Sequence, residues 1–402
     1  MKRDHPLIAI APDSFKGALD AAGVAAAIAA GLKRALPAAR FRLIPMADGG
    51  EGTVDAWTAA TRSTRVRARV RDPLGRAITA GYARNHRQKL AVIEMAAASG
   101  LPLLTPNERD PLITSTAGTG DLIRHALDGG ARRILLGIGG SATNDGGVGL
   151  AAALGARFLD RQGRALPPGG GALRALDRID LAGLDPRIGQ VRIEVACDVT
   201  NPLCGRQGAA AVYGPQKGAT PAVVRQLDTG LRRLARIVTR HDPGQAGTEN
   251  QPGAGAAGGL GYGLMVFCGA RLRRGVEMIA ESVGLEDRLR GCALVITGEG
   301  RMDAQTVQGK TPSGVAAVAR RLGIPVIAIC GCVGPGYEAV HQAGIAAVIP
   351  VAHGPFDPEH PAVGAAARIR ACAEETGRLL ALQPNVREFG CCWLPPRRIV
   401  DG

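Results

Sequence analysis

Aromatic residues are scarce in this sequence: Phe, Trp and Tyr together make up 3% of its 402 residues. The core must therefore be built from Ala, Val, Leu and Ile. The scarcity also argues against a protein that stacks nucleic-acid bases on aromatic rings. The arginines of residues 62–71 nearly alternate with apolar residues, as on the solvated face of a strand. We therefore expect no nucleic acid as a partner, although the net charge of +14 keeps a nucleic-acid-binding protein as a remote alternative.

Lysine is rare as well, with six copies against 43 arginines. Three of the six, Lys16, Lys217 and Lys310, lie inside glycine-rich segments. A compact ammonium group cannot be exchanged freely for a planar guanidinium. These three positions are therefore candidates for a specific role, and an acidic small molecule is one partner that a basic chain suggests.

The sequence also lacks paired cysteine motifs and long apolar runs. Its nine cysteines form no CxxC pair with zinc-like partners, so we expect reduced thiols rather than a metal or disulfide framework. The longest Ala-rich stretch, residues 21–32, is too short to span a bilayer, which takes about 20 residues. No signal-peptide pattern is present at the N-terminus. These absences predict a cytoplasmic protein without a membrane partner.

What the sequence has instead is a repeated order of strand, loop and helix. Strands are expected at residues 7–11, 41–45, 133–138, 191–199, 293–297, 325–329 and 346–351, and helices at 17–36, 121–127, 221–240, 313–322 and 361–382. Residues 65–95 contain three further strands with an antiparallel pattern, and residues 242–261 resemble a long polar loop. The alternation predicts an α/β fold with a mostly parallel sheet. Ligands of such sheets bind beyond the carboxyl ends of the strands.

Nearly every expected strand end carries glycine together with an acid, a hydroxyl or a lysine. Residues 139–147, GGSATNDGG, connect a buried strand to a helix, and their backbone N–H groups suit an anion. Ser141 and Thr143 add hydroxyls, and Asp145 adds a carboxylate suited to Mg²⁺. Residues 255–261 form a similar but less specific segment. Tight structural turns are the alternative interpretation of both.

Acids at two N-terminal strand ends are further candidates. Asp13 is followed by Lys16, and Asp48 by Glu51, each pair on a turn that leads into a helix. Helix capping explains Asp13, Asp48 and Glu51 equally well, because acids favour a helix N-terminus. Capping does not explain Lys16.

Three more segments combine charge with glycine. Asp198 ends a buried strand, and Lys217 stands at the tip of a GPQKG turn. Glu299, Arg301 and Asp303 follow another strand directly. Each has a structural alternative, such as bonding to turn amides, but together they place several carboxylates and cations at strand ends.

Familiar nucleotide and hydrolase motifs are missing. Residues 304–311 read AxxxxGKT, which lacks the first glycine of a P-loop and does not follow a strand directly. No GxGxxG fingerprint with a downstream acid appears, and the histidines pair with no Ser or Cys motif. Anion loops, Mg²⁺-capable carboxylates and isolated lysines together suit phosphoryl transfer, which depends on positioning and charge neutralisation.

The motifs resemble those of the bacterial glycerate kinase family, of the type that makes 2-phosphoglycerate. The matching segments are APDSFKG at 11–17, PMADGGEGT at 45–53, GIGGSATNDGG at 137–147, CDVTNPLCG at 197–205, YGPQKGAT at 213–220, PGAGAAGGLG at 252–261 and ITGEGRMDAQTVQGKTPSGVA at 296–316. The resemblance covers residues 6–382. The tail 383–402 does not fit it, and we expect that tail to be loosely ordered.

The resemblance implies ATP-dependent phosphorylation of D-glycerate with Mg²⁺, giving 2-phosphoglycerate and ADP. It also implies two α/β domains with a cleft between them. One is a Rossmann-like open parallel sheet built from both chain ends, residues 1–64 and 285–382, and the other is inserted at 65–284. The sequence leaves open whether the chain forms a homo-oligomer.

We assign roles to the motif positions on physical grounds. The expected catalytic residues are Asp198, as base or metal ligand, and Lys16, Glu299 and Asp303. The expected substrate-binding residues are Asp13, Ser14, Asp48, Glu51 and Arg301. The expected ATP-binding residues are Gly139, Gly140, Ser141, Thr143, Lys217, Gly258, Gly259 and Lys310. The expected metal ligands are Asp145 and Asp198. The alternatives are a kinase that gives 3-phosphoglycerate or acts on another small hydroxy acid, and more remotely a glycerate sensor without catalysis.

Overall fold

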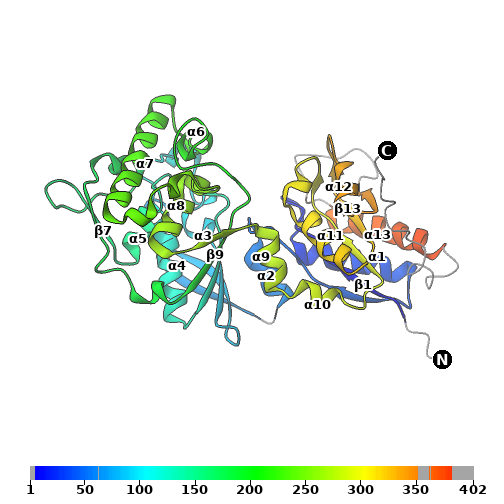
Figure 1. The fold of residues 1–402 in the computed structure, drawn as a ribbon. Coiled ribbons are helices and arrows are strands. Elements are labelled where there is room, and N and C mark those ends of the chain that lie inside the picture. The colour runs from blue at the N-terminus through cyan, green and yellow to red at the C-terminus, as the bar shows by residue number, and fades with distance from the viewer. Residues whose placement is uncertain (1–4, 62, 352–361, 363, 383–402) are drawn as a thin grey trace, which may run out of the picture. The chain divides into compact units, whose positions relative to one another are not determined.

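The computed structural model describes residues 5–61, 63–351, 362 and 364–382 (Figure 1). The expected tail at 383–402 lies outside these residues. The chain divides into two compact units, one made of residues 1–46 and 284–402 and the other of residues 47–283. The sequence placed the divisions at 64/65 and 284/285. Residues 53–60 belong to the second unit because the helix that they form packs on two strands of that unit.

The first unit is built on a five-stranded sheet in the order β15-β13-β11-β1-β2, with every neighbouring pair parallel. Its strands are β1 (Leu7–Ile10), β2 (Arg40–Leu43), β11 (Leu294–Thr297), β13 (Val326–Cys330) and β15 (Ala347–Pro350), with the short pair β12 (Arg301–Met302) and β14 (Cys332–Val333) beside them. Its helices are α1 (Ala21–Ala35), α10 (Leu285–Leu289), α11 (Thr311–Arg321), α12 (Ala339–Gln342) and α13 (Ala365–Ala381). Segments from both ends of the chain therefore share one sheet.

Helix α1 shows how an Ala-rich sequence packs here. Asp20 caps its N-terminus by accepting a hydrogen bond from Gly23 N at 2.7 Å. Its apolar face, which includes Val24, Ile28 and Leu32, is buried in the core of this unit. Gly31 lets α13 approach closely, because a Cβ there would lie 2.2 Å from Arg370 O. Close contact between helices that carry small residues thus fills the core in the absence of large aromatic side chains.

The second unit contains a six-stranded sheet in the order β10-β9-β6-β5-β4-β3. Its elements are α2 (Thr53–Ala60), β3 (Thr64–Arg71), β4 (Ala77–Asn85), β5 (Leu90–Glu94), α3 (Ala96–Ser99), α4 (Ala117–Asp128), β6 (Arg133–Gly137), α5 (Val148–Ala153), β7 (Arg157–Leu159), β8 (Arg178–Asp180), β9 (Arg192–Ala196), α6 (Ala209–Tyr213), α7 (Pro221–His241), α8 (Ala256–Cys268), β10 (Arg271–Arg273) and α9 (Gly275–Ser282). The pairs β3–β4 and β4–β5 are antiparallel, as expected, and the remaining pairs of this sheet are parallel.

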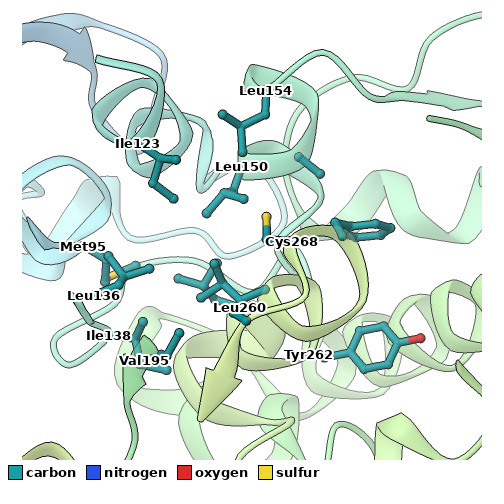
Figure 2. Packing of buried hydrophobic residues seen from close by; sticks show 14 of the residues in the cluster. Met95, Ile123, Leu136, Ile138, Leu150, Leu154, Val195, Leu260, Tyr262 and Cys268 are labelled. Atoms are coloured by element: carbon teal, nitrogen blue, oxygen red, sulfur yellow. The ribbon is translucent and has the colours of Figure 1, made fainter. Parts of the chain in front are cut away.

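The core of the second unit gathers side chains from strands and helices far apart in the sequence. Leu136 and Val195 come from β6 and β9, Leu150 comes from α5, and Leu260 comes from α8 (Figure 2). Residues 242–261, expected as a loop, end inside α8, which begins at Ala256. The α/β fold expected from the alternation is confirmed. None of the described helices is both long and apolar enough to cross a membrane.

Candidate active site

Two acidic residues of the first unit lie at the carboxyl ends of neighbouring parallel strands. Asp13 follows β1, and Glu299 follows β11, with which β1 pairs in parallel. Asp13 N donates a hydrogen bond to Gly298 O at 2.8 Å, which continues the pairing beyond the strands. Since the carboxyl ends of parallel strands meet at one edge, the sheet brings both expected site residues together.

Asp13 does not cap helix α1, because Asp20 does so. Its carboxylate instead accepts a hydrogen bond from Thr311 Oγ1 at 2.5 Å and another from Ser14 N at 2.6 Å. Asp13 is only 9% exposed. These bonds fix the carboxylate between the start of α11 and the loop that carries Lys16, which is itself exposed.

Glu299 is an acid whose pKa lies well above its ordinary value. It is 8% exposed, and its Oε1 accepts a hydrogen bond from Thr306 Oγ1 at 2.6 Å. Burial, together with the negative charges of Asp13 and Asp303, raises the pKa of Glu299 to about 7, although Thr306 and Lys310 oppose the rise. A carboxyl group with such a pKa can exchange a proton near neutral pH.

Lys310, Asp303 and Arg301 complete the charged group around Glu299. Lys310 Nζ lies 3.6 Å from Glu299 Oε2 and 3.5 Å from Asp303 Oδ1. Arg301 Nε lies 3.4 Å from Asp303 Oδ2. Burial opposes the shift, but the Gln305 amide and the Lys310 charge hold the pKa of Asp303 below its usual range. Lys310 was expected to bind ATP, but it lies beside Glu299 and Asp303 in the charged group of the first unit.

A second group of acids lies at the carboxyl edge of the sheet in the second unit. Gly275 N donates to Asp198 Oδ1 at 3.1 Å, and Gly50 N donates to Asp48 Oδ1 at 2.9 Å. Backbone contact brings the two loops together, because a Cβ on Gly275 would lie 1.6 Å from Asp48 O. Desolvation, and then the charge of Asp48, raise the pKa of Asp198 to about 6. Glu51, one turn further on, is exposed.

Glu94, at the end of β5, is a member of this edge that sequence reasoning missed. Its Oε1 accepts a hydrogen bond from Val54 N at 2.6 Å. It thereby supplies the N-terminal cap that Gly52 cannot give to helix α2. Burial raises the pKa of Glu94, and hydrogen bonds from the Val54 and Gly52 amides partly offset this rise. The one signal in the sequence was an acid ending a buried apolar run.

The glycine-rich loop after β6 is contacted by a buried lysine, Lys217. Lys217 is 0% exposed, and its Nζ donates to Ser141 Oγ at 2.7 Å and to Thr143 O at 2.6 Å. Burial lowers the pKa of Lys217 to about 7, although the charge of Asp145 opposes the shift. Gly139 and Gly140, by contrast, are exposed. The geometry therefore gives Lys217 a contact with the loop rather than an open path to a ligand.

Asp145 occupies the interior of the same loop. Its carboxylate accepts hydrogen bonds from Thr116 N at 2.8 Å, Gly147 N at 3.1 Å and Gly149 N at 3.2 Å, and from the Thr116 hydroxyl. Burial raises the pKa of this carboxyl, while these bonds favour its ionised form. With both oxygens engaged and 1% exposure, Asp145 fits a structural role. The expected metal role does not suit this geometry.

Gly258 and Gly259 pack against the glycine-rich loop instead of forming a separate one. Both have left-handed backbones, with φ of 72° and 85°. Gly146 N donates to Gly258 O at 3.1 Å, and a Cβ on Gly258 would lie 1.9 Å from Thr143 O. Only glycine allows this approach.

Two carboxylates of the second unit are candidates for binding a divalent cation. Within the part of the chain that the structure describes, no group of three or more His, Cys, Asp or Glu residues is arranged to hold a metal. Mg²⁺ is commonly bound by one or two carboxylates together with substrate phosphates. Asp48 and Asp198 are a pair of carboxylates that fits this requirement. The cysteines at 197, 204, 268, 292, 330, 332 and 372 are free thiols.

Both units thus carry acids, lysines and glycine-rich loops at strand ends, an arrangement suited to an enzyme that transfers phosphoryl groups. Residues 8–381 match the model of the glycerate kinase family. The chain belongs to the glycerate kinase family, as its motifs predicted, and it is a kinase, an enzyme of the transferase class.

Named relatives and a solved structure agree with this assignment. A glycerate kinase of Halalkalibacterium halodurans is 53% identical over 340 residues, covering 84% of this chain and 88% of that protein. The glycerate 2-kinase of Escherichia coli K12 is 48% identical, covering 86% of this chain and 90% of that protein. A crystal structure of a candidate glycerate kinase 2 from Salmonella typhimurium LT2 matches with a TM-score of 0.86 at 47% identity, covering 94% of this chain and 99% of that one.

Proposed function

We propose that this chain transfers the γ-phosphoryl group of ATP to D-glycerate, giving 2-phosphoglycerate and ADP with the help of Mg²⁺. The observation that carries the proposal is Glu299, a nearly buried acid with a pKa of about 7 beside Lys310. The name of the Escherichia coli relative, glycerate 2-kinase, supports the choice of acceptor and product. The partner is therefore a small molecule.

The first unit supplies the groups for the acceptor. Lys16 and Arg301 are cations suited to the glycerate carboxylate, and we assign Ser14 and Asp13 to its hydroxyls. Glu299 Oε2 accepts the proton of the reacting hydroxyl. The hydroxyl oxygen forms a bond to the γ-phosphorus while the bond to the β,γ-bridging oxygen breaks, and ADP leaves with that electron pair. Glu299 then releases its proton to solvent.

Lys310 and Asp303 set the electrostatics of that proton transfer. The Lys310 ammonium favours the carboxylate form of Glu299, and the Asp303 charge disfavours it. The balance keeps the acid able to both accept and release a proton near pH 7. We therefore assign Lys310 to the charged group around Glu299 and not to nucleotide binding.

The second unit supplies the groups for the donor. The exposed backbone of Gly139 and Gly140, at the end of β6, suits the phosphates of ATP. Ser141 and Thr143 belong to the same loop, and Lys217 holds both in place. Lys217 is therefore a positioning residue in this account. Asp48 and Asp198 would hold Mg²⁺, which when bound neutralises charge on the phosphate oxygens.

A coupled assay of ADP release tests the proposal. D-Glycerate should be the preferred acceptor over L-glycerate, glycolate and D-lactate. Glu299→Gln should lower kcat by about 100-fold or more, the usual contribution of a general base. Glu338→Gln, at an exposed acid of the same unit, is the matched control and should retain full activity. Preference for another hydroxy acid would contradict the acceptor, and an active Glu299→Gln enzyme would contradict the base.

A further inference from the structure

The hydroxyl of Thr306 has two hydrogen-bond partners of opposite kind. Thr306 begins a short 3₁₀ turn, Thr306–Gln308, between the charged group around Glu299 and helix α11, and it is 0% exposed. Its Oγ1 lies 3.0 Å from Asp303 N and 2.6 Å from Glu299 Oε1. A backbone N–H can only donate, so the hydroxyl oxygen accepts from Asp303 and its single hydrogen is directed to Glu299. The Asp303 amide therefore fixes the direction of the bond to Glu299.

This bond makes the two carboxyl oxygens of Glu299 unequal. Oε1 is engaged as the acceptor of the Thr306 hydroxyl. Oε2 makes no hydrogen bond to a residue that the structure describes, because Lys310 Nζ, the cation that faces it, lies 3.6 Å away and beyond hydrogen-bond distance. The lone pairs of Oε2 are therefore left for an incoming proton.

Thr306 is itself held in place by its neighbours in the chain. Ser313 Oγ, in the first turn of α11, donates to Thr306 O and to Lys310 O, each at 2.8 Å. Thr306 N donates to Asp303 O at 3.0 Å, so the backbone and the hydroxyl of Thr306 both bond to the same residue. Since Thr306 is 0% exposed, it touches no substrate, and its effect on the reaction passes through Glu299.

The titratable groups that face Glu299 come from separate segments. Asp13 follows β1, Asp303 follows β12, Lys310 precedes α11 and Cys330 ends β13. Burial raises the pKa of Glu299, and the two aspartates raise it further, whereas Thr306 and Lys310 lower it. Cys330 adds no charge near neutral pH, because burial raises the pKa of its thiol to about 12. Thr306 is an uncharged donor, so it can be replaced without changing the charges around Glu299.

We propose that Thr306 is a positioning residue, which orients the carboxyl group of Glu299 and reserves Oε2 for the proton of the reacting hydroxyl. The proposal rests on the proposed function, because it takes Glu299 as the base. The hydrogen bond from Thr306 favours the ionised form of the acid. It also opposes rotation of the carboxyl group, which would exchange the two oxygens. Sequence reasoning gave no role to Thr306, although it lies within the segment 296–316.

The dependence of kcat on pH in Thr306→Val tests the proposal. Valine keeps the shape of threonine but cannot donate to Glu299, so the rising limb of the profile should move to higher pH by about one pH unit. KM for ATP and for D-glycerate should not change, because Thr306 touches neither. Thr306→Ser keeps the hydroxyl and should restore the limb of the wild type. Thr376→Val, at a buried threonine of α13 whose hydroxyl donates to Cys372 O at 2.8 Å, is the matched control and should leave the limb in place.

The possible results separate this role from the proposed function. An unmoved limb in Thr306→Val, in a chain whose activity depends on Glu299, would overturn the role of Thr306 alone. A loss of kcat that is equal at every pH would show a purely structural role and contradict the proposal. Full activity in Glu299→Gln would overturn the proposed function as well. If Thr306→Val does not fold, Thr306→Cys takes its place, because a thiol is a weaker donor and should move the limb in the same direction.

Discussion

Lys310 Nζ lies 3.6 Å from Glu299 Oε2, so a cation from the start of α11 faces an acid from the end of β11. Glu299 is nearly buried, which disfavours its charge, and Lys310 partly restores it. The pair explains how an acid with a pKa of about 7 is obtained at this edge of the sheet. Its consequences can be measured separately in activity and in stability.

Activity should rise with pH through about 7, because Glu299 must be ionised to accept a proton. Lys310→Met removes the charge that favours the carboxylate, so the rising limb of the profile of kcat against pH should move to higher pH. Lys33→Met, at the exposed end of α1, should leave the limb in place. A limb that stays fixed in Lys310→Met would exclude Glu299 as the titrating base.

Glu299 should also cost stability at neutral pH. Its pKa in the folded chain is about 7, above the ordinary value of 4.5, so its favourable contribution is complete below pH 4.5 and is lost as pH rises through 7. Glu299→Gln does not titrate. The free energy of unfolding of Glu299→Gln minus that of the wild type should therefore increase by about 2–4 kcal/mol between pH 4.5 and pH 7. Urea denaturation at several pH values measures this, and a pH-independent difference would contradict the assigned pKa.

Lys217 should have the opposite effect on the alkaline side. Burial lowers its pKa to about 7 from 10.5, so between these values the unfolded chain binds more protons than the folded chain. The free energy of unfolding should therefore rise with pH across this window. Lys217→Met should lack that rise, and the difference between the two denaturation series isolates it from other groups. If the unfolding free energies of the wild type and Lys217→Met changed equally with pH, Lys217 would not titrate in this range.

Asp198→Asn should lower kcat by about 100-fold or more and raise the Mg²⁺ concentration needed for half-maximal rate, since a carboxylate ligand is lost. Glu277→Gln is a suitable control, because this exposed acid contributes to the electrostatics of Asp198 without a proposed role. Turnover of Asp198→Asn within a few-fold of wild type would remove Asp198 from the site.

Gly258→Ala should disrupt the glycine-rich loop, because its Cβ would meet Thr143 O at 1.9 Å on a left-handed backbone. Gly269 is the matched comparison, with φ of 59° and open space around it. Gly269→Ala should cost only about 1–2 kcal/mol of unfolding free energy, the strain of the backbone alone. Gly258→Ala should cost more and lose activity. Equal losses of unfolding free energy in the two variants would show that the chain around Gly258 can move to accommodate a Cβ with little loss of stability.

The regular alternation of strands and helices, and the acids at the ends of β1 and β11, could be predicted from the sequence because a parallel sheet places its strand ends along one edge. The environment of Asp145 could not, since its main donor, Thr116, comes from a segment 29 residues away. Glu94 was missed because a single acid after an apolar run carries no motif. The division at Met46 depends on helix α2 packing against β4 and β5, which no local pattern records.

The most direct test of the whole account is ³¹P NMR of the purified chain with MgATP and D-glycerate. We expect ADP together with the phosphoester signal of 2-phosphoglycerate, which reports acceptor and regiochemistry at once. A 3-phosphoglycerate signal would contradict the proposed regiochemistry. ADP and free phosphate without a phosphoester would contradict D-glycerate as the acceptor.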